Sequence, residues 1–166
     1  MVEFKKIDNQ KVLFVGTNKI FSSIIKKKAE EIDAFYVNNY WLGGTLTNWN
    51  TIQKIIENLK DLELKLQQKK NSKKESLKLK KRIYKLNYLF GGIKNMNSLP
   101  DIVIFIDQFK DILGIKECLK LGITTICIVD SNCNPDIVSF PIPGNDDSLK
   151  SVNFILDYLT KKISKI

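Results

Sequence analysis

The densest group of charged side chains in the sequence is a run of positive charge near its middle. The 17 residues from 69 to 85 contain a single acid, Glu75, against nine basic residues: Lys69, Lys70, Lys73, Lys74, Lys78, Lys80, Lys81, Arg82 and Lys85. A lysine run is often only a solvated helix face, but such a face normally mixes signs so that residues four apart can pair. A surplus of this size can neutralise phosphates. We therefore expect this segment to bind RNA or another polyanion.

Two aspartates and one glycine occupy positions where α/β enzymes often bind phosphate or metal. Asp107 and Asp130 each end an apolar, strand-like run, but no nucleophile or cation in the same pattern completes a site, so we expect turn or capping roles. Gly16 joins another such run to a helical segment. The dinucleotide and phosphate-loop spacings of glycine are both missing around it, which predicts a tight turn instead.

Composition excludes several kinds of chemistry. The sequence has no histidine, so histidine catalysis and histidine metal ligation are excluded. Three cysteines without a Cys-x-x-Cys spacing provide neither a zinc nor a redox signature: Cys118, Cys127 and Cys133. No apolar run approaches the ~20 residues that span a bilayer, and the first residues resemble neither a signal peptide nor a transit peptide. We expect no metal, no cofactor, no membrane, and a protein that works in the compartment where it is made.

The positive charge is concentrated in one segment. The net charge is +9; between Lys54 and Lys85 there are twelve basic and four acidic residues, against fifteen and fourteen in the remainder. Lysine accounts for 26 of the 27 basic residues, although arginine binds phosphate better, and Ile, Lys and Asn together make 64 of the 166 residues. Since no binding function demands this bias, we attribute it to an A+T-rich genome and expect an organelle-encoded gene.

The elements outside the charged segment alternate between strand and helix. Short apolar runs predict five strands, the last of them edge-like: 11–15, 35–37, 101–107, 124–130 and 140–143. Helical spacing and capping residues predict three helices: from about Asn18 to Ile32, from Ile112 to Leu121, and from Gly144–Asp147 to about Lys162. This alternation predicts a right-handed, doubly wound parallel sheet.

The charged segment itself is predicted to be an inserted helical hairpin. Leucines and isoleucines recur at heptad spacing on the way out, at Ile52, Ile55, Leu59, Leu62 and Leu66. They recur again on the way back, at Leu79, Ile83, Leu86 and Phe90. Two such seams can pair as a short antiparallel coiled coil, with 67–75 as the tip and Thr47 or Asn50 capping the first helix. The predicted domains are a discontinuous α/β domain, 1–46 and 91–166, and a hairpin, 47–90.

Paired glycines lie at both ends of the hairpin. The first pair, Gly43 and Gly44, lies in an apolar loop between two bulky anchors, Trp41 and Trp49; the second pair is Gly91 and Gly92. Adjacent glycines between large apolar residues indicate a need for backbone freedom or close packing. We expect both pairs to act as hinges and both tryptophans to pack, with stacking on a base or partner helix as the alternative.

The loop that begins the hairpin also carries a family resemblance. Residues 35–38 and then Trp41, Leu42, Gly43, Gly44, Thr45, Leu46, Thr47, Asn48 and Trp49 resemble the signature of the bacterial and organellar S2 family, proteins of the small ribosomal subunit. The resemblance extends over nearly the whole chain, in family order, through 13–17, 89–93, 99–101, 128–132, 135–136 and 142–147.

This resemblance implies a structural RNA-binding protein and no enzyme. The family fold is a flavodoxin-like parallel sheet with a protruding hairpin, and its partners are small-subunit rRNA and neighbouring ribosomal proteins. Two departures stand out: a longer N-terminal region is usual in the family, and Asn39-Tyr40 replaces the usual His-Arg. From the first departure we expect the contacts of that region to be absent or supplied by a separate polypeptide. We also expect a mitochondrial ribosome, with the plastid as the alternative.

Two other functions stay open from the sequence alone. One is a flavodoxin-like enzyme or regulator that binds a nucleotide or phosphate through Gly16, or through Asp107 and Asp130. The other is a scaffold whose hairpin binds a coiled coil of another protein. Nucleotide binding by the purified protein would identify the first, and association that resists nuclease would identify the second.

Overall fold

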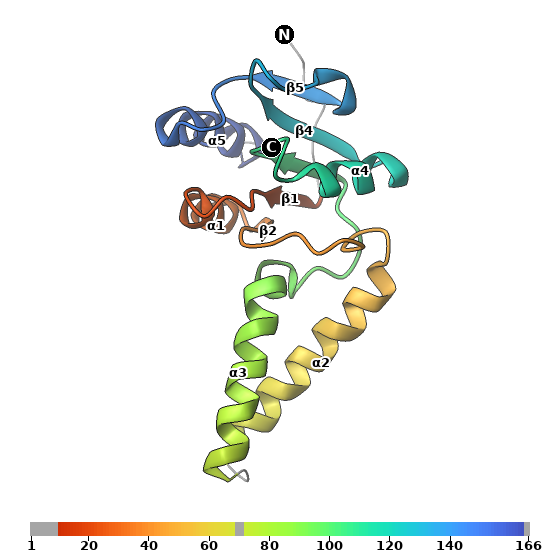
Figure 1. Cartoon of the computed structure of the whole chain (residues 1–166), viewed down its shortest axis with the longest axis vertical. Coiled ribbons are helices and arrows are strands. Elements are labelled where there is room, and N and C mark those ends of the chain that lie inside the picture. The colour runs from red at the N-terminus through yellow and green to blue at the C-terminus, as the bar shows by residue number, and fades with distance from the viewer. Residues whose placement is uncertain (1–9, 69–71, 165–166) are drawn as a thin grey trace.

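A computed structural model describes residues 10–68 and 72–164, which form a parallel sheet with helices on both faces (Figure 1). The five strands are β1 (Val12–Val15), β2 (Phe35–Val37), β3 (Ile102–Phe105), β4 (Thr124–Val129) and β5 (Phe140–Pro143). They pair in the order β2-β1-β3-β4-β5, and every pair is parallel. This flavodoxin-like order confirms the predicted fold class.

The helices alternate with the strands and include two that leave the sheet. They are α1 (Ser22–Glu31), α2 (Trp49–Gln67), α3 (Lys73–Phe90), α4 (Ile112–Leu121) and α5 (Leu149–Ser164), with short 3-10 helices η1 (Gly91–Ile93) and η2 (Pro135–Ile137). Among the described residues, none of these helices has the length and apolar character needed to cross a membrane.

The two faces of the sheet carry separate cores. Val12, Phe14 and Ile104 point into a core shared with α1 and α5, whereas Leu13 and Phe105 point into a core shared with α4 and the base of the hairpin. Successive residues of β1 and β3 are buried on opposite faces, because side chains alternate along a strand. This explains why these strands are apolar without a polar alternation.

Both edges of the sheet are protected from pairing with another chain. β5 carries two prolines, Pro141 and Pro143, which lack the N–H that a further strand would need. At the other edge, β2 lies against η1, where Gly92 approaches the carbonyl oxygen of Tyr36. Gly92, the second glycine of its pair, therefore permits this close contact at the edge of the sheet.

Two predicted helix starts are wrong by several residues, for the same reason. α1 begins at Ser22 rather than at Asn18, because the Asn18 side chain accepts the N–H of Ile20 and forms a local turn. α5 begins at Leu149 rather than in 144–147, because Asn145 accepts the N–H groups of Asp147 and Ser148 in the same way. α4 and its left-handed C-terminal glycine, Gly122, agree with the prediction.

The hairpin projects from the sheet as two antiparallel helices, α2 and α3 (Figure 1). Its outer seam comprises Leu59, Leu62 and Ile83, which are buried, with Leu66, Leu79 and Leu86 packed against them. Near the sheet the predicted seam joins the body: Ile52 and Phe90 are buried in the body core. Ile56, which was not predicted, is buried there too, whereas the predicted Ile55 is half-buried and packs against the same core.

The caps of the hairpin helices differ from the prediction. Neither Thr47 nor Asn50 caps α2, which begins at Trp49 after an Asn48 that makes no side-chain cap. The return helix α3 begins at Lys73, inside the predicted tip, because Ser72 and Glu75 form a reciprocal capping box. The division into an α/β domain and a hairpin domain stays a prediction.

Candidate nucleic-acid interface

The loop at the base of the hairpin folds around one buried carboxylate, Glu117, which comes from α4. Its Oε1 accepts the indole Nε1–H of Trp41 at 2.9 Å and the N–H of Gly44 at 2.8 Å. Its Oε2 accepts the N–H groups of Leu46 and Thr47, both at 2.9 Å, and the Thr47 hydroxyl at 3.1 Å. A single side chain thus holds the entry to α2 against the body.

Glu117 stays ionised in this setting. Burial raises the pKa of its carboxyl, but the hydrogen bonds from Thr47, Trp41, Leu46 and Gly44 outweigh that effect and leave the pKa below its ordinary value. The sequence reasoning missed this residue. The available signal was an acid that interrupts the buried positions Ile115 and Cys118 of an otherwise apolar helix face.

The paired glycines are not equivalent. Gly44 has φ +90°, a left-handed conformation that side chains rarely adopt, whereas a Cβ on Gly43 would meet nothing within 4 Å. A Cβ on Gly92 would lie 2.1 Å from the carbonyl oxygen of Tyr36, but one on Gly91 would have its nearest neighbour at 3.8 Å. One glycine of each pair therefore has a geometric role, Gly44 and Gly92, and the hinge role expected for both pairs stays a prediction.

The remaining residues of the predicted signature divide between core and surface. Trp41, Thr45 and Trp49 are buried, and the Trp41 ring packs on Phe105 with 6.3 Å between ring centroids. Because Trp41 and Trp49 are both buried, they pack in the core and cannot stack on a base. The residues of this loop that reach the surface are Leu42, Gly43, Thr47 and Asn48.

The predicted cations lie along the outer surface of α3. Seven are exposed, and among the described residues none of the seven forms an ion pair: Lys73, Lys74, Lys78, Lys80, Lys81, Arg82 and Lys85. The one acid on α3, Glu75, is engaged in the capping box. Lys69 and Lys70 lie outside the described residues.

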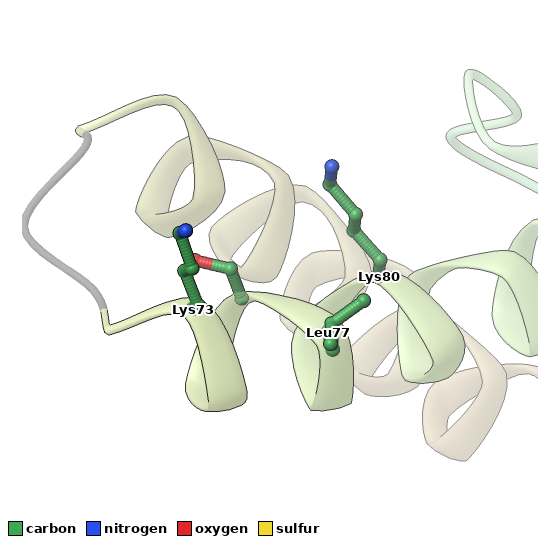
Figure 2. Close-up of a pocket in the computed structure, with 4 residues that line it drawn as sticks. Lys73, Leu77 and Lys80 are labelled. Carbon is green, nitrogen blue, oxygen red and sulfur yellow. The ribbon is translucent and has the colours of Figure 1, made fainter.

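These cations border a shallow hollow near the start of α3, which Figure 2 shows in close-up. Its lining comes from successive turns of one helix: Lys73, Ser76, Leu77 and Lys80. The lysine ammonium groups and the Leu77 side chain lie along the same side of α3 (Figure 2). A surface with this mixture can neutralise phosphate and also contact an apolar group.

The carboxyl edge of the sheet, where nucleotides bind in related folds, is filled by the protein itself. The Oδ1 of buried Asp111 accepts the Thr17 N–H at 3.3 Å and its hydroxyl at 2.8 Å, groups that a phosphate would need. Burial raises the pKa of Asp111 to about 6. A Cβ on Gly16 would lie 2.3 Å from Ile25, so this glycine permits tight packing.

The two strand-end aspartates bond to nearby backbone. Asp107 accepts the N–H of Lys110 at 3.0 Å, and Asp130 accepts the N–H of Ser131 at 2.6 Å. These are the turn and capping roles expected from the sequence. Within 10–68 and 72–164, no group of three or more histidine, cysteine or acidic residues is arranged to hold a metal ion. In the part of the chain that the structure describes, the carboxylates of this edge are therefore engaged with Thr17 and with local backbone.

Comparison with known proteins identifies the family. The model of the family described as "Ribosomal protein S2" matches residues 2–165. "Small ribosomal subunit protein uS2c" of Galdieria sulphuraria is 50% identical over 94% of this chain and 67% of its own length; that of Guillardia theta is 47% identical over 94% and 68%. "Small ribosomal subunit protein uS2" of Synechocystis is 44% identical over 98% of this chain and 61% of its own length.

These matches place the sequence signature, the parallel sheet and the inserted hairpin in one known family. The chain spans about two thirds of the length of the curated relatives it matches. The family is one of ribosomal proteins and not of enzymes. The chain belongs to the ribosomal protein S2 family.

Proposed function

We propose that the chain is a structural component of the small subunit of a plastid-type ribosome and binds rRNA through the outer face of its hairpin. The names of the relatives support the subunit, and the uS2c proteins of algae support the plastid. They favour the plastid alternative over the mitochondrial location predicted from the sequence. Neighbouring ribosomal proteins are the second class of partner.

The observation that carries the RNA contact is the unpaired charge of α3. Seven cations of this helix are exposed, and its only acid is used in its cap. Because a protein gains little from seven like charges on one helix, their retention is explained by a partner that carries phosphates. Lysine acts there as a point charge, so the contact fixes position more than it reads sequence.

The salt dependence of RNA binding tests this proposal directly. Small-subunit rRNA transcribed from the plastid gene of Galdieria sulphuraria would be titrated with the full chain at several salt concentrations. Replacing Lys73, Lys74, Lys78 and Lys81 with glutamine should make the slope of log affinity against log salt shallower by about three, because each phosphate that is no longer neutralised reduces the slope by ~0.7–0.9.

A matched variant controls for net charge. Glutamine at four exposed lysines of the α/β body, Lys19, Lys27, Lys116 and Lys120, removes the same charge from another surface. This variant should keep a slope close to that of the original chain. Equal slopes for the two variants, or an unchanged slope in the α3 variant, would overturn the proposed role of α3.

Assembly into the subunit needs a separate measurement. A tagged copy expressed in Synechocystis, whose uS2 is 44% identical, should sediment with small subunits in a sucrose gradient. Recovery only at the top of the gradient would contradict the ribosomal proposal. In the organism that encodes the chain, an antibody should detect it in purified plastid ribosomes; detection in mitochondrial ribosomes instead would overturn the plastid assignment.

A further inference from the structure

The outer face of α3 carries a stripe of apolar and aromatic side chains in addition to its lysines. Leu77, Tyr84 and Tyr88 are 61%, 75% and 42% exposed. Their spacing of seven and four residues places them on one side of a helix with 3.6 residues per turn. This side is opposite the buried positions Ile83 and Phe90. The stripe therefore does not contribute to the seam that holds α3 to α2.

Lysines border the stripe on both sides. By the same helical geometry, Lys73 and Lys80 flank it on one side, and Lys74, Lys81 and Lys85 flank it on the other. Figure 2 shows the first of these two flanks, where Lys73, Leu77 and Lys80 follow one another along the helix. An exposed apolar side chain is ordinary by itself, but a row of three between two rows of cations indicates a surface that a partner covers.

A further exposed tyrosine, Tyr40, follows the residue that contacts the end of α3. The Asn39 side chain donates its Nδ2–H to the carbonyl oxygen of Tyr88 at 3.0 Å, which ties the loop after β2 to the end of α3. The next residue, Tyr40, is 55% exposed. The loop that contacts the end of α3 thus carries another exposed aromatic side chain.

We propose that this stripe binds unpaired nucleotides of rRNA, with Tyr84 and Tyr88 stacking on bases while the flanking lysines neutralise the adjacent phosphates. The inference rests on the proposed function and specifies its mode. Alternation of aromatic rings with cations is the chemistry of single-strand binding, because each base offers a face and each linkage a charge. A regular duplex hides its base faces, so the stripe selects looped or single-stranded segments.

Charge also favours RNA over a protein as the occupant. The cores of protein interfaces are depleted in lysine, because burying an ammonium group is costly, whereas this stripe cannot be covered without approaching five lysines. An acidic protein could pair with these lysines. It would then leave the tyrosine rings without the stacking partners that a row of bases supplies.

Aromatic substitution in the full chain tests the proposal. The probes are a 12-nucleotide single-stranded RNA carrying 2-aminopurine and a 12-base-pair RNA duplex. Tyr84→Leu and Tyr88→Leu keep an apolar side chain but remove the ring, so each should weaken single-strand binding about tenfold. Duplex binding and the salt slope should not change, because every lysine that neutralises a phosphate is retained.

Two control variants isolate the ring. Tyr84→Phe keeps stacking and should retain both the affinity and the 2-aminopurine quenching of the original chain. Tyr158→Leu removes a tyrosine on α5 whose exposure, 56%, lies between those of Tyr84 and Tyr88, and which has Lys162 over its ring at 5.6 Å. This variant should leave binding unchanged. Thermal melting of each variant verifies that α3 remains folded.

The outcomes separate this inference from the proposed function. Unchanged single-strand affinity in both leucine variants, with a shallower slope in the lysine variant, would overturn the stacking inference and leave the phosphate contact standing. Unaffected binding in the lysine and tyrosine variants alike would overturn both. Normal RNA binding with reduced incorporation into subunits would assign the stripe to a neighbouring protein, which also overturns the inference.

Discussion

Glu117 and the outer face of α3 both concentrate charge at the hairpin, one at its base and the other along its length. The single carboxylate of Glu117 is buried and accepts hydrogen bonds from four backbone or indole N–H groups and one hydroxyl. The seven cations of α3 are exposed, and within the described residues they have no counter-ion.

The difference separates charge used for folding from charge left for a partner. In the folded protein, N–H and O–H groups of residues 41–47 replace the water molecules that hydrated the Glu117 carboxylate before folding. Because all of these donors must face one carboxylate, its charge orders the loop. Along α3 the ammonium groups keep their hydration and contribute little to folding, because exposed charges are well screened. Substitutions at the two places should therefore have opposite consequences for stability and for RNA binding.

The largest loss of stability is expected from Glu117→Gln. Glutamine presents only one acceptor oxygen, and its amide N–H₂ would face backbone donors, so we expect unfolding in urea to become easier by about 3 kcal/mol. Glu57→Gln, on an exposed position of α2, should change stability by no more than ~0.5 kcal/mol. Similar values for the two variants would remove the distinction between the hairpin base and its outer face.

The next largest effect is expected where the hairpin returns to the sheet. Gly92→Ala places a Cβ against the backbone oxygen of Tyr36, so the strand edge or η1 must shift, at a cost of about 2 kcal/mol. Gly91→Ala has room and helical backbone angles, and should be neutral within ~0.5 kcal/mol. Thermal unfolding of the pair measures this contrast, and equal melting temperatures would contradict it.

The pH dependence of stability provides a further contrast, because Asp111 is a buried carboxylate with fewer hydrogen-bond donors than Glu117. Asp111 accepts two hydrogen bonds, its other oxygen has no partner among the described residues, and burial raises its pKa from 3.8 to about 6. The folded protein therefore binds a proton that the unfolded chain has released between about pH 4 and pH 6, and stability falls as the pH rises through this window.

Asp111→Asn should remove this dependence. Between pH 5 and pH 7.5, ionisation of the Asp111 carboxyl should reduce the free energy of unfolding of the original chain by about 1 kcal/mol. The variant should not show this decrease. Glu117 behaves in the opposite way, because its pKa is lowered in the folded protein. It stabilises the fold at pH values above its ordinary pKa of 4.5, and this stabilisation is lost as the pH falls through the pKa of the folded state. Parallel pH profiles for the Asp111 variant and the original chain would contradict the assignment.

The smallest effect on stability is expected on α3 itself. Lys81→Gln removes an exposed cation from a row of like charges, so stability should change by no more than ~0.5 kcal/mol while RNA affinity falls. Urea unfolding and filter binding of the same preparation measure both quantities. A loss of stability comparable to that of Glu117→Gln would mean that this face packs against the protein.

The fold followed from patterns that are short along the chain. Apolar runs such as 102–105 and 124–129 read directly as buried strands, and the leucine spacing in α2 and α3 predicted their seam. Each of these signals depends on residues within a few turns or one strand of one another. The surplus of lysine was equally local, so the amino-acid sequence was enough to predict a positively charged hairpin.

Helix ends and caps were harder to predict, because short polar side chains can cap a helix or form a separate turn. Asn18 and Asn145 had the right types to cap α1 and α5 but instead bonded to the N–H two residues later. Thr47, a predicted cap, donates its hydroxyl to Glu117. Competition between these local bonds is decided by what surrounds them.

The sequence alone therefore determined the parallel sheet, the inserted hairpin, the excess of positive charge and, through residues 41–49, the family. Tertiary structure alone decided that Glu117 orders that loop, that the geometric demand falls on Gly44 and Gly92, and that Trp41 and Trp49 are buried. The physical reason is separation along the chain. Glu117 lies 70 residues from Thr47, and their contact exists only because the sheet carries α4 beside the hairpin base.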